Sequence, residues 1–129
     1  MSAADAPLRR RGRGWIALAA VVGASAVGLA AFGAHALRGR LAAAAFSPWD
    51  TAAHYQLVHA VALLGLGLYA EATGRSVRLP ATLLCVGLAL FCGGLYLLVA
   101  TGWSGAGLLA PLGGMTLIAG WLALLALWR

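Results

Sequence analysis

The sequence predicts an all-α integral membrane protein, an antiparallel bundle of four transmembrane helices. Of its 129 residues, 63% are hydrophobic and only 9% are charged, whereas a soluble domain carries about 25% charged residues. The apolar residues form four runs, each close to the roughly 20 residues that span a bilayer. Short segments rich in polar residues or glycine separate these runs. A chain of this length forms one domain, and lipid is the solvent for most of it.

Residues 1–14 are predicted to form an arginine-rich cytoplasmic tail, and the first span covers about 15–36. A cleavable signal peptide is the alternative, because arginines precede the apolar run and Ala34-His35-Ala36 resembles a cleavage site. Signal peptides have apolar regions of only about 7 to 15 residues. The run here is longer and three more follow it, so the first run is predicted to stay as a span.

The connector after the first span is predicted to end at Pro48, because a proline is disfavoured inside a helix. Leu41 to Phe46 is predicted to be a short helix in the membrane interface, with Trp49 at headgroup level. Asp50 or Ser47 is placed to cap the next helix. The remaining spans are predicted at about 51–70, 79–101 and 108–128.

The net charge of +6 comes from arginines at the ends of the apolar runs, four of them before the first run. This distribution is typical of topology determinants, not of a basic face that follows nucleic-acid phosphates. With the N-terminus inside, seven arginines lie inside and only Arg38 and Arg40 lie outside. The positive-inside rule then predicts both termini in the cytoplasm. The predicted location is the bacterial inner (plasma) membrane, with the lipid bilayer as a partner and no nucleic acid.

Small residues on the spans predict where the helices approach one another. Lipid does not drive helices together, so close backbone contact at small side chains is needed. The residues predicted to serve this packing are Ala24 and Gly28 on the first span, Gly93 and Gly94 on the third, and Gly113 and Gly114 on the fourth.

Polar side chains from different spans are predicted to converge in the outer half of the bundle. Tyr55 and His59 lie on one face of the second span, and Cys85, Cys92 and Tyr96 share the face of the third that meets it. The predicted polar cluster, a candidate binding site, consists of His35, His54, Tyr55, Gln56, His59 and Tyr96.

Three interpretations of this cluster remain open from the sequence. The polar groups hydrogen-bond across helices to hold them in register, or they form a site for a small solute or a proton, since histidine titrates near neutrality. The third is a metal or haem between His35 and His54 at matched depth. Against cation transport, the acidic residues Asp50 and Glu71 lie only at span ends. No metal or other cofactor is predicted.

Four blocks of sequence resemble the YgdD-like family of small four-helix membrane proteins. They are Ala31 to Leu37, Trp49 to Ala52 with Tyr55 to Ala60, Phe91 to Tyr96, and Ala110 to Gly114 with Gly120-Trp121. The resemblance implies a four-span membrane protein of unknown biochemical function and supplies no catalytic residue. The chain also lacks the Gly-x-Ser-x-Gly, His-Glu-x-x-His and phosphate-loop motifs.

The predicted function is therefore structural or partner-binding, without enzymatic activity. Transport of a small solute or a proton is the first alternative. The second alternative is an accessory subunit of a larger membrane complex, such as a respiratory one. A homo-oligomer or such a complex is the expected assembly.

Overall fold

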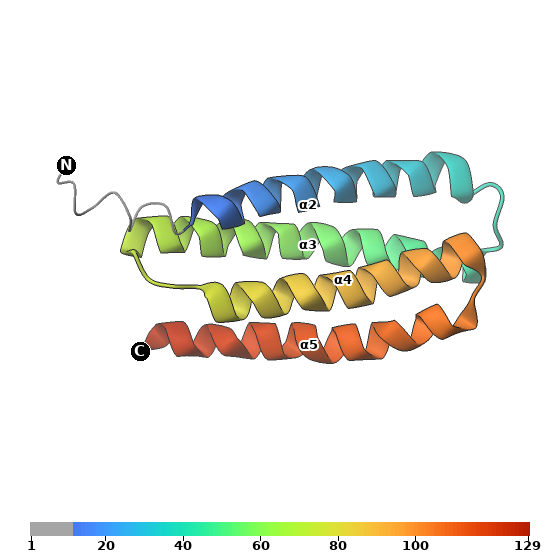
Figure 1. Ribbon diagram of the computed structural model, residues 1–129. Helices are drawn as coiled ribbons and strands as arrows, with labels where there is room; N and C mark the ends of the chain where they lie inside the picture. The colour runs from blue at the N-terminus through green and yellow to red at the C-terminus, as the bar shows by residue number, and fades with distance from the viewer. Residues whose placement is uncertain (1–11) are drawn as a thin grey trace.

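A computed structural model describes residues 12–129, which form helices joined by short connections, with no strand in that range (Figure 1). The first helix begins at Arg13, so the predicted tail over residues 1–14 lies almost wholly outside the described residues. The four helical segments are Arg13–Leu37, Ala43–Thr73, Arg78–Thr101 and Ser104–Trp128. Each is long and apolar enough to cross a membrane, which confirms the predicted fold class.

Two of the four segments change helical type at an end. Helix α2 (Arg13–Phe32) continues into a π-helical turn, η1 (Gly33–Leu37). Helices α3 (Ala43–Thr73) and α4 (Arg78–Thr101) are α-helical throughout. Helix α5 (Leu109–Ala123) lies between two 3-10 turns, η2 (Ser104–Leu108) and η3 (Leu124–Trp128).

The helices pack in the order in which they follow in the chain. Helices α3 and α4 form the middle of the bundle, α2 packs on α3, and α5 packs on α4 (Figure 1). Neighbours run antiparallel, so the start of α2, the α3–α4 loop and the end of the chain lie at one end. Helices α2 and α5 share no extensive interface among the described residues.

The prediction that Pro48 marks a helix boundary is wrong. Helix α3 begins at Ala43 and runs through Pro48 without interruption, and its N-cap is Ala42, not Asp50 or Ser47. The separate interface helix over residues 41–46 is also wrong, since most of that stretch is the first turn of α3. How much of α3 lies within the bilayer stays a prediction.

Packing on both sides of Pro48 explains why the helix continues. Phe46 and Trp49 are buried to 8% and 7% exposure, and the Trp49 ring lies so close to Gly33 that an added Cβ there would be 2.6 Å from it. In lipid these side chains stabilise the helix through close packing and hydrogen bonding, and the Trp49 indole N–H also donates to the Leu29 carbonyl at 2.8 Å. These contacts offset the roughly 3 kcal/mol or more that a proline costs inside a helix. Trp49 therefore lies inside the bundle rather than at its surface.

Two glycines end helices in the left-handed conformation. Gly74 follows α3 with φ of 68°, and Gly102 follows α4 with φ of 69°. Positive φ is disfavoured for residues with a Cβ, and a glycine at this position is the usual helix stop.

Helices α2 and α3 meet most closely where α2 begins. A Cβ on Gly12 would be 2.1 Å from the carbonyl oxygen of Gly67, so only glycine fits there. The Glu71 carboxylate of α3 accepts hydrogen bonds from the backbone N–H groups of Gly12 and Arg13, both at 3.0 Å. These N–H groups lack partners within their own helix. Glu71 thus caps α2 from the neighbouring helix, with its negative charge at the positive end of the helix dipole.

Replacing Glu71 with Ala is expected to lower the free energy of unfolding by about 1 kcal/mol, the usual value for a lost helix cap. Glu71→Gln keeps an acceptor and should lose less. Thermal unfolding of the detergent-solubilised protein, followed by circular dichroism, measures both variants. Equal stability of Glu71→Ala and the unchanged protein would show that the cap contributes nothing.

Glycines also bring α4 and α5 into direct backbone contact. An added Cβ would lie 2.3 Å from the Phe91 nitrogen at Gly113, 2.9 Å from the Ala106 oxygen at Gly94, and 2.8 Å from Leu117 at Gly87. The predicted packing residues Gly94 and Gly113 lie in this interface. We call the close contact between α4 and α5 the glycine seam; its residues are Gly87, Gly94, Gly113 and Gly120.

The other predicted packing residues lie elsewhere. A Cβ on Gly28 or Gly93 would meet nothing within 4 Å, and one on Gly114 would only reach Phe91 at 3.9 Å. Ala24 is exposed, while Ala19 and Ala26 are buried. The expectation that Ala24, Gly28 and Gly93 pack inside this bundle is therefore wrong. The spacing of small residues indicates that a helix has a face suited to packing, but it does not state which face meets a neighbour.

Candidate functional site

Gln56, one of the predicted cluster residues, joins three helices. Its Nε2 donates hydrogen bonds to the Ser25 hydroxyl at 2.8 Å and to the Val22 carbonyl at 3.1 Å, both on α2. Its Oε1 accepts a hydrogen bond from the Tyr96 hydroxyl of α4 at 2.8 Å. Hydrogen bonds between membrane helices average about 0.6 kcal/mol. Three of them at one side chain fix the mutual positions of α2, α3 and α4.

Two further contacts extend this connection. The Trp49 indole N–H donates to the Leu29 carbonyl at 2.8 Å, and its ring packs edge-on against Tyr96 with centroids 4.7 Å apart. The Cys92 thiol donates to the Ala52 carbonyl at 3.3 Å. The predicted face of the third span, with Cys92 and Tyr96, therefore does meet the second. Cys85 and Cys92 are both free thiols.

His59 forms a second, separate polar contact. It is only 4% exposed. Its Nδ1 lies 2.7 Å from the Tyr55 carbonyl one turn earlier, and its Nε2 lies 3.0 Å from the indole nitrogen of Trp121 on α5. The Tyr55 ring stacks on the imidazole and also contacts Phe91.

These partners match only one form of the His59 ring. A carbonyl oxygen only accepts and an indole N–H only donates, so Nδ1 carries a hydrogen and Nε2 does not. This is a neutral imidazole with both nitrogens engaged. Protonation of Nε2 would place two N–H groups against each other and break the bond to Trp121.

Replacing Trp121 with Phe should leave Nε2 of His59 without its hydrogen-bond donor. We expect the ¹⁵N signals of His59 to show a neutral ring protonated at Nδ1 in both proteins, because the Tyr55 carbonyl still accepts from Nδ1, and the Nε2 signal to shift in Trp121→Phe. The bundle should lose about 0.6 kcal/mol of stability, the average for one such bond. Trp103→Phe is the matched control, because Trp103 is 60% exposed. An unchanged His59 spectrum in Trp121→Phe would contradict the bond.

The remaining cluster residues take part in neither the Gln56 contacts nor the His59 contacts. His35 lies in η1 and His54 on α3, both are exposed, and neither side chain has a hydrogen-bond partner within residues 12–129. His54 and Tyr55 line a surface hollow of about 350 Å³ with Asp50 and Thr51. No group of three or more His, Cys, Asp or Glu that could hold a metal occurs in the same range.

The depth of the cluster differs from the depth that the sequence predicts for a span beginning at Thr51. Helix α3 begins at Ala43, so His59 lies near the middle of the helix. Because the sequence places the start of this helix at Thr51, it also does not indicate Trp121 as the partner of His59. His59 is 16 residues from the start of α3, and Trp121 is 17 residues from Ser104, where the fourth helical segment starts at the same end. With α3 started at Thr51 the two depths do not match.

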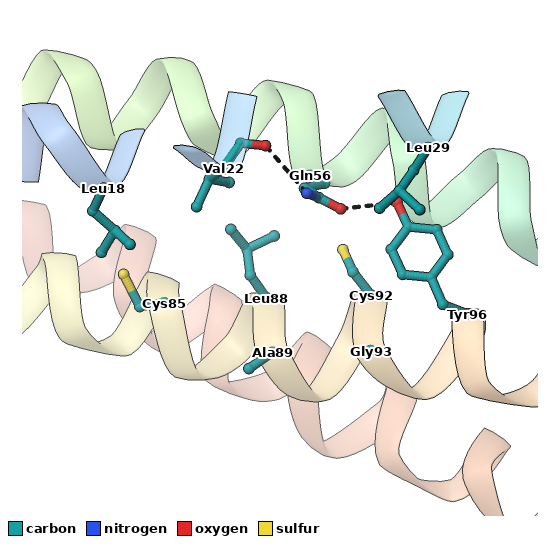
Figure 2. Close-up of a pocket in the computed structure, with 10 residues that line it drawn as sticks. All are labelled: Leu18, Val22, Leu29, Gln56, Cys85, Leu88, Ala89, Cys92, Gly93 and Tyr96. Carbon is teal, nitrogen blue, oxygen red and sulfur yellow. Dashed lines mark hydrogen bonds between the residues drawn. The ribbon is translucent and has the colours of Figure 1, made fainter. Parts of the chain in front are cut away.

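A groove follows the space between α2 and α4, with α3 as its floor (Figure 2). Its volume is about 380 Å³, and it is mostly apolar. The bonded pair Gln56 and Tyr96 lies toward one end, near Leu29, whereas Leu18 and Cys85 lie toward the other (Figure 2). The lining residues are Leu18, Val22, Leu29, Gln56, Cys85, Leu88, Ala89, Cys92, Gly93 and Tyr96.

Comparisons with known proteins agree on the kind of protein. The family model described as "Protein of unknown function (DUF423)" matches residues 29–114. The UPF0382 membrane protein of Staphylococcus haemolyticus is 38% identical over 111 residues, which cover 86% of this chain and 91% of the relative. UPF0382 membrane protein YwdK of Bacillus subtilis is 36% identical over 110 residues, 84% of this chain and 89% of that protein. No solved structure matches the chain significantly.

These matches confirm the predicted small membrane family of unknown function. The YgdD-like name itself stays a prediction. The matched range 29–114 contains Gln56, His59 and Tyr96 but not Trp121.

Proposed function

We propose that this chain, which belongs to the DUF423 family of membrane proteins, also named UPF0382, acts without catalysis. Its role is that of a stable four-helix bundle that binds a partner within the membrane. Of the predicted cluster, Gln56, His59 and Tyr96 then serve to hold the helices in register. The relatives are named membrane proteins, and the bacterial inner membrane is the proposed location.

The single observation that supports this role is that each buried polar side-chain atom in the described range has a hydrogen-bond partner. Among residues 12–129, no buried side-chain nitrogen or oxygen lacks a hydrogen-bond partner. A transport or catalytic site usually keeps a polar group available for its substrate. Gln56 and His59 instead use their polar atoms on Ser25, Tyr96 and Trp121 of neighbouring helices.

The pairing of His59 also favours this role over proton transport. A proton carrier must accept and release a proton at the ring while keeping access to water. His59 is 4% exposed and would lose its bond to Trp121 on protonation.

Proton flux into reconstituted vesicles tests the proposal. A pH-sensitive dye is enclosed, and a pH gradient with a membrane potential is applied. Vesicles with the unchanged protein should acidify at the rate of empty vesicles, and His59→Ala should make no difference. A flux that requires the protein and disappears in His59→Ala would overturn the proposal in favour of transport.

The proposed orientation places both termini in the cytoplasm. Arg13, Arg75, Arg78 and Arg129 belong to one end of the bundle and Arg38 and Arg40 to the other (Figure 1), which agrees with the positive-inside rule. Single cysteines at positions 38 and 76, in a chain whose two native cysteines are replaced by Ala, should react with an impermeant maleimide from the outside and the inside respectively. Labelling of position 38 only from the cytoplasm would reverse the orientation.

A further inference from the structure

We propose that the groove between α2 and α4 binds a lipid that places one hydrocarbon chain in the groove and a hydroxyl group at its polar end. This assigns the groove a ligand, which the proposed function does not require. The groove extends from Leu18 to Leu29 along α2 and from Cys85 to Tyr96 along α4. Each stretch advances eleven residues, which is about 16 Å of helical rise. Helices α2 and α4 run in the same direction, so the two stretches line one long channel.

The width of the groove favours a hydrocarbon chain over a helix as its occupant. A volume of about 380 Å³ over about 16 Å gives a mean cross-section of roughly 23 Å². Including the open space in front of the groove, about 770 Å³ in total, raises this to roughly 47 Å². An α-helix with its side chains is about 10 to 12 Å wide, which is a cross-section of roughly 80 to 110 Å². A helix of a second copy or of another protein therefore does not fit, whereas an extended chain does.

The lining of the groove also suits a hydrocarbon chain. Leu18, Val22, Leu29, Leu88 and Ala89 contribute apolar side chains, and Gly93 leaves open space in which an added Cβ would meet nothing within 4 Å. Both walls belong to segments that are long and apolar enough to cross the membrane. The mouth of the groove is then reached from the hydrocarbon of the bilayer.

The polar end of the groove specifies the head group. Both Nε2 hydrogens of Gln56 are donated to α2, and the one hydroxyl hydrogen of Tyr96 is donated to Gln56 Oε1. The Val22 carbonyl can only accept, which fixes which atom of the amide is the nitrogen. At this end of the groove, the Tyr96 oxygen and Gln56 Oε1 can each still accept a hydrogen bond, but no hydrogen remains to donate. A hydroxyl head can donate to these atoms, whereas a phosphodiester or an ester carbonyl offers only acceptors.

Photolabelling in phosphatidylcholine nanodiscs tests the assignment. The probe is a hexadecanol with a diazirine in its chain, and labelled peptides are identified by mass spectrometry. We expect saturable labelling of the α2 and α4 peptides that line the groove. Unlabelled hexadecanol should compete about fivefold better than hexadecyl methyl ether, which cannot donate, since one neutral hydrogen bond is worth about 1 kcal/mol. Tyr96→Phe should remove much of this difference.

Two glycines supply a matched pair of variants. Gly93→Leu fills the open space of the groove and should reduce labelling about tenfold. Gly28→Leu adds the same side chain where a Cβ also meets nothing, but outside the groove, and should label normally. Ala89→Leu is a second way to fill the groove if Gly93→Leu does not fold.

Three results would overturn the proposal. Labelling spread evenly over all four helices, or unchanged when the groove is filled, would mean ordinary contact with bulk lipid. Equal competition by alcohol and ether would remove the hydroxyl assignment and leave a phospholipid chain as occupant. Loss of labelling as the number of protein copies per disc increases would show that a second copy covers the groove.

Discussion

Gly113→Ala is expected to disrupt the bundle more than an added methyl group at any other glycine of the seam. The new Cβ would lie 2.3 Å from the Phe91 nitrogen and 2.7 Å from its Cα. These are backbone atoms within a helix, so they cannot rotate away as a side chain can. Helices α4 and α5 would have to separate along the glycine seam. Overpacking typically costs about 1 to 3 kcal/mol, and we expect the upper end of this range because the neighbour is rigid. This is a large share of the roughly 5 to 15 kcal/mol by which a typical native protein is stable.

Gly114→Ala is the matched control for this variant. It makes the same change at the next residue, where the new Cβ meets only the Phe91 ring at 3.9 Å. It should be neutral or slightly stabilising, because alanine favours the helix by up to about 1 kcal/mol over glycine. Unfolding of both variants by increasing dodecyl sulfate in mixed micelles gives the comparison. Equal midpoints would show that the seam tolerates a side chain and that the α4–α5 contact is looser than described.

Gln56→Leu is expected to have the second largest effect. The variant keeps a similar volume but loses the bonds to Ser25, Val22 and Tyr96 together. Three interhelical bonds at about 0.6 kcal/mol give a loss of about 2 kcal/mol. The Tyr96 hydroxyl would also lose its acceptor, which adds to the cost in an apolar groove.

Ser25→Ala supplies the comparison for Gln56→Leu, because it removes one of the three partners and leaves the others. It should lose about 0.6 kcal/mol. The same mixed-micelle unfolding measures both, and the double variant should lose no more than Gln56→Leu alone, since the Ser25 contact is already absent there. Additive losses would show that Ser25 acts independently of Gln56.

Much of the architecture follows from the sequence alone. The apolar composition and the lengths of the runs predict four helical spans, and helices able to cross a membrane occupy the corresponding segments. Helical periodicity places Cys92 and Tyr96 on one face of the third span, and both contact α3. These features depend on local sequence, because run length and the spacing of side chains on a helix need no knowledge of other segments.

The pairing of residues across helices was decided only by the tertiary structure. Pro48 signals a helix end locally, but the burial of Phe46 and Trp49 carries α3 back to Ala43. Starting α3 at Thr51 misplaces its depth by eight residues, or about 12 Å of helical rise, and hides the contact of His59 with Trp121. The choice of the face of α2 that meets α3 likewise depends on the neighbouring helix. Sequence spacing fixes positions along and around one helix, whereas the offset and rotation between helices come from how their side chains fit together.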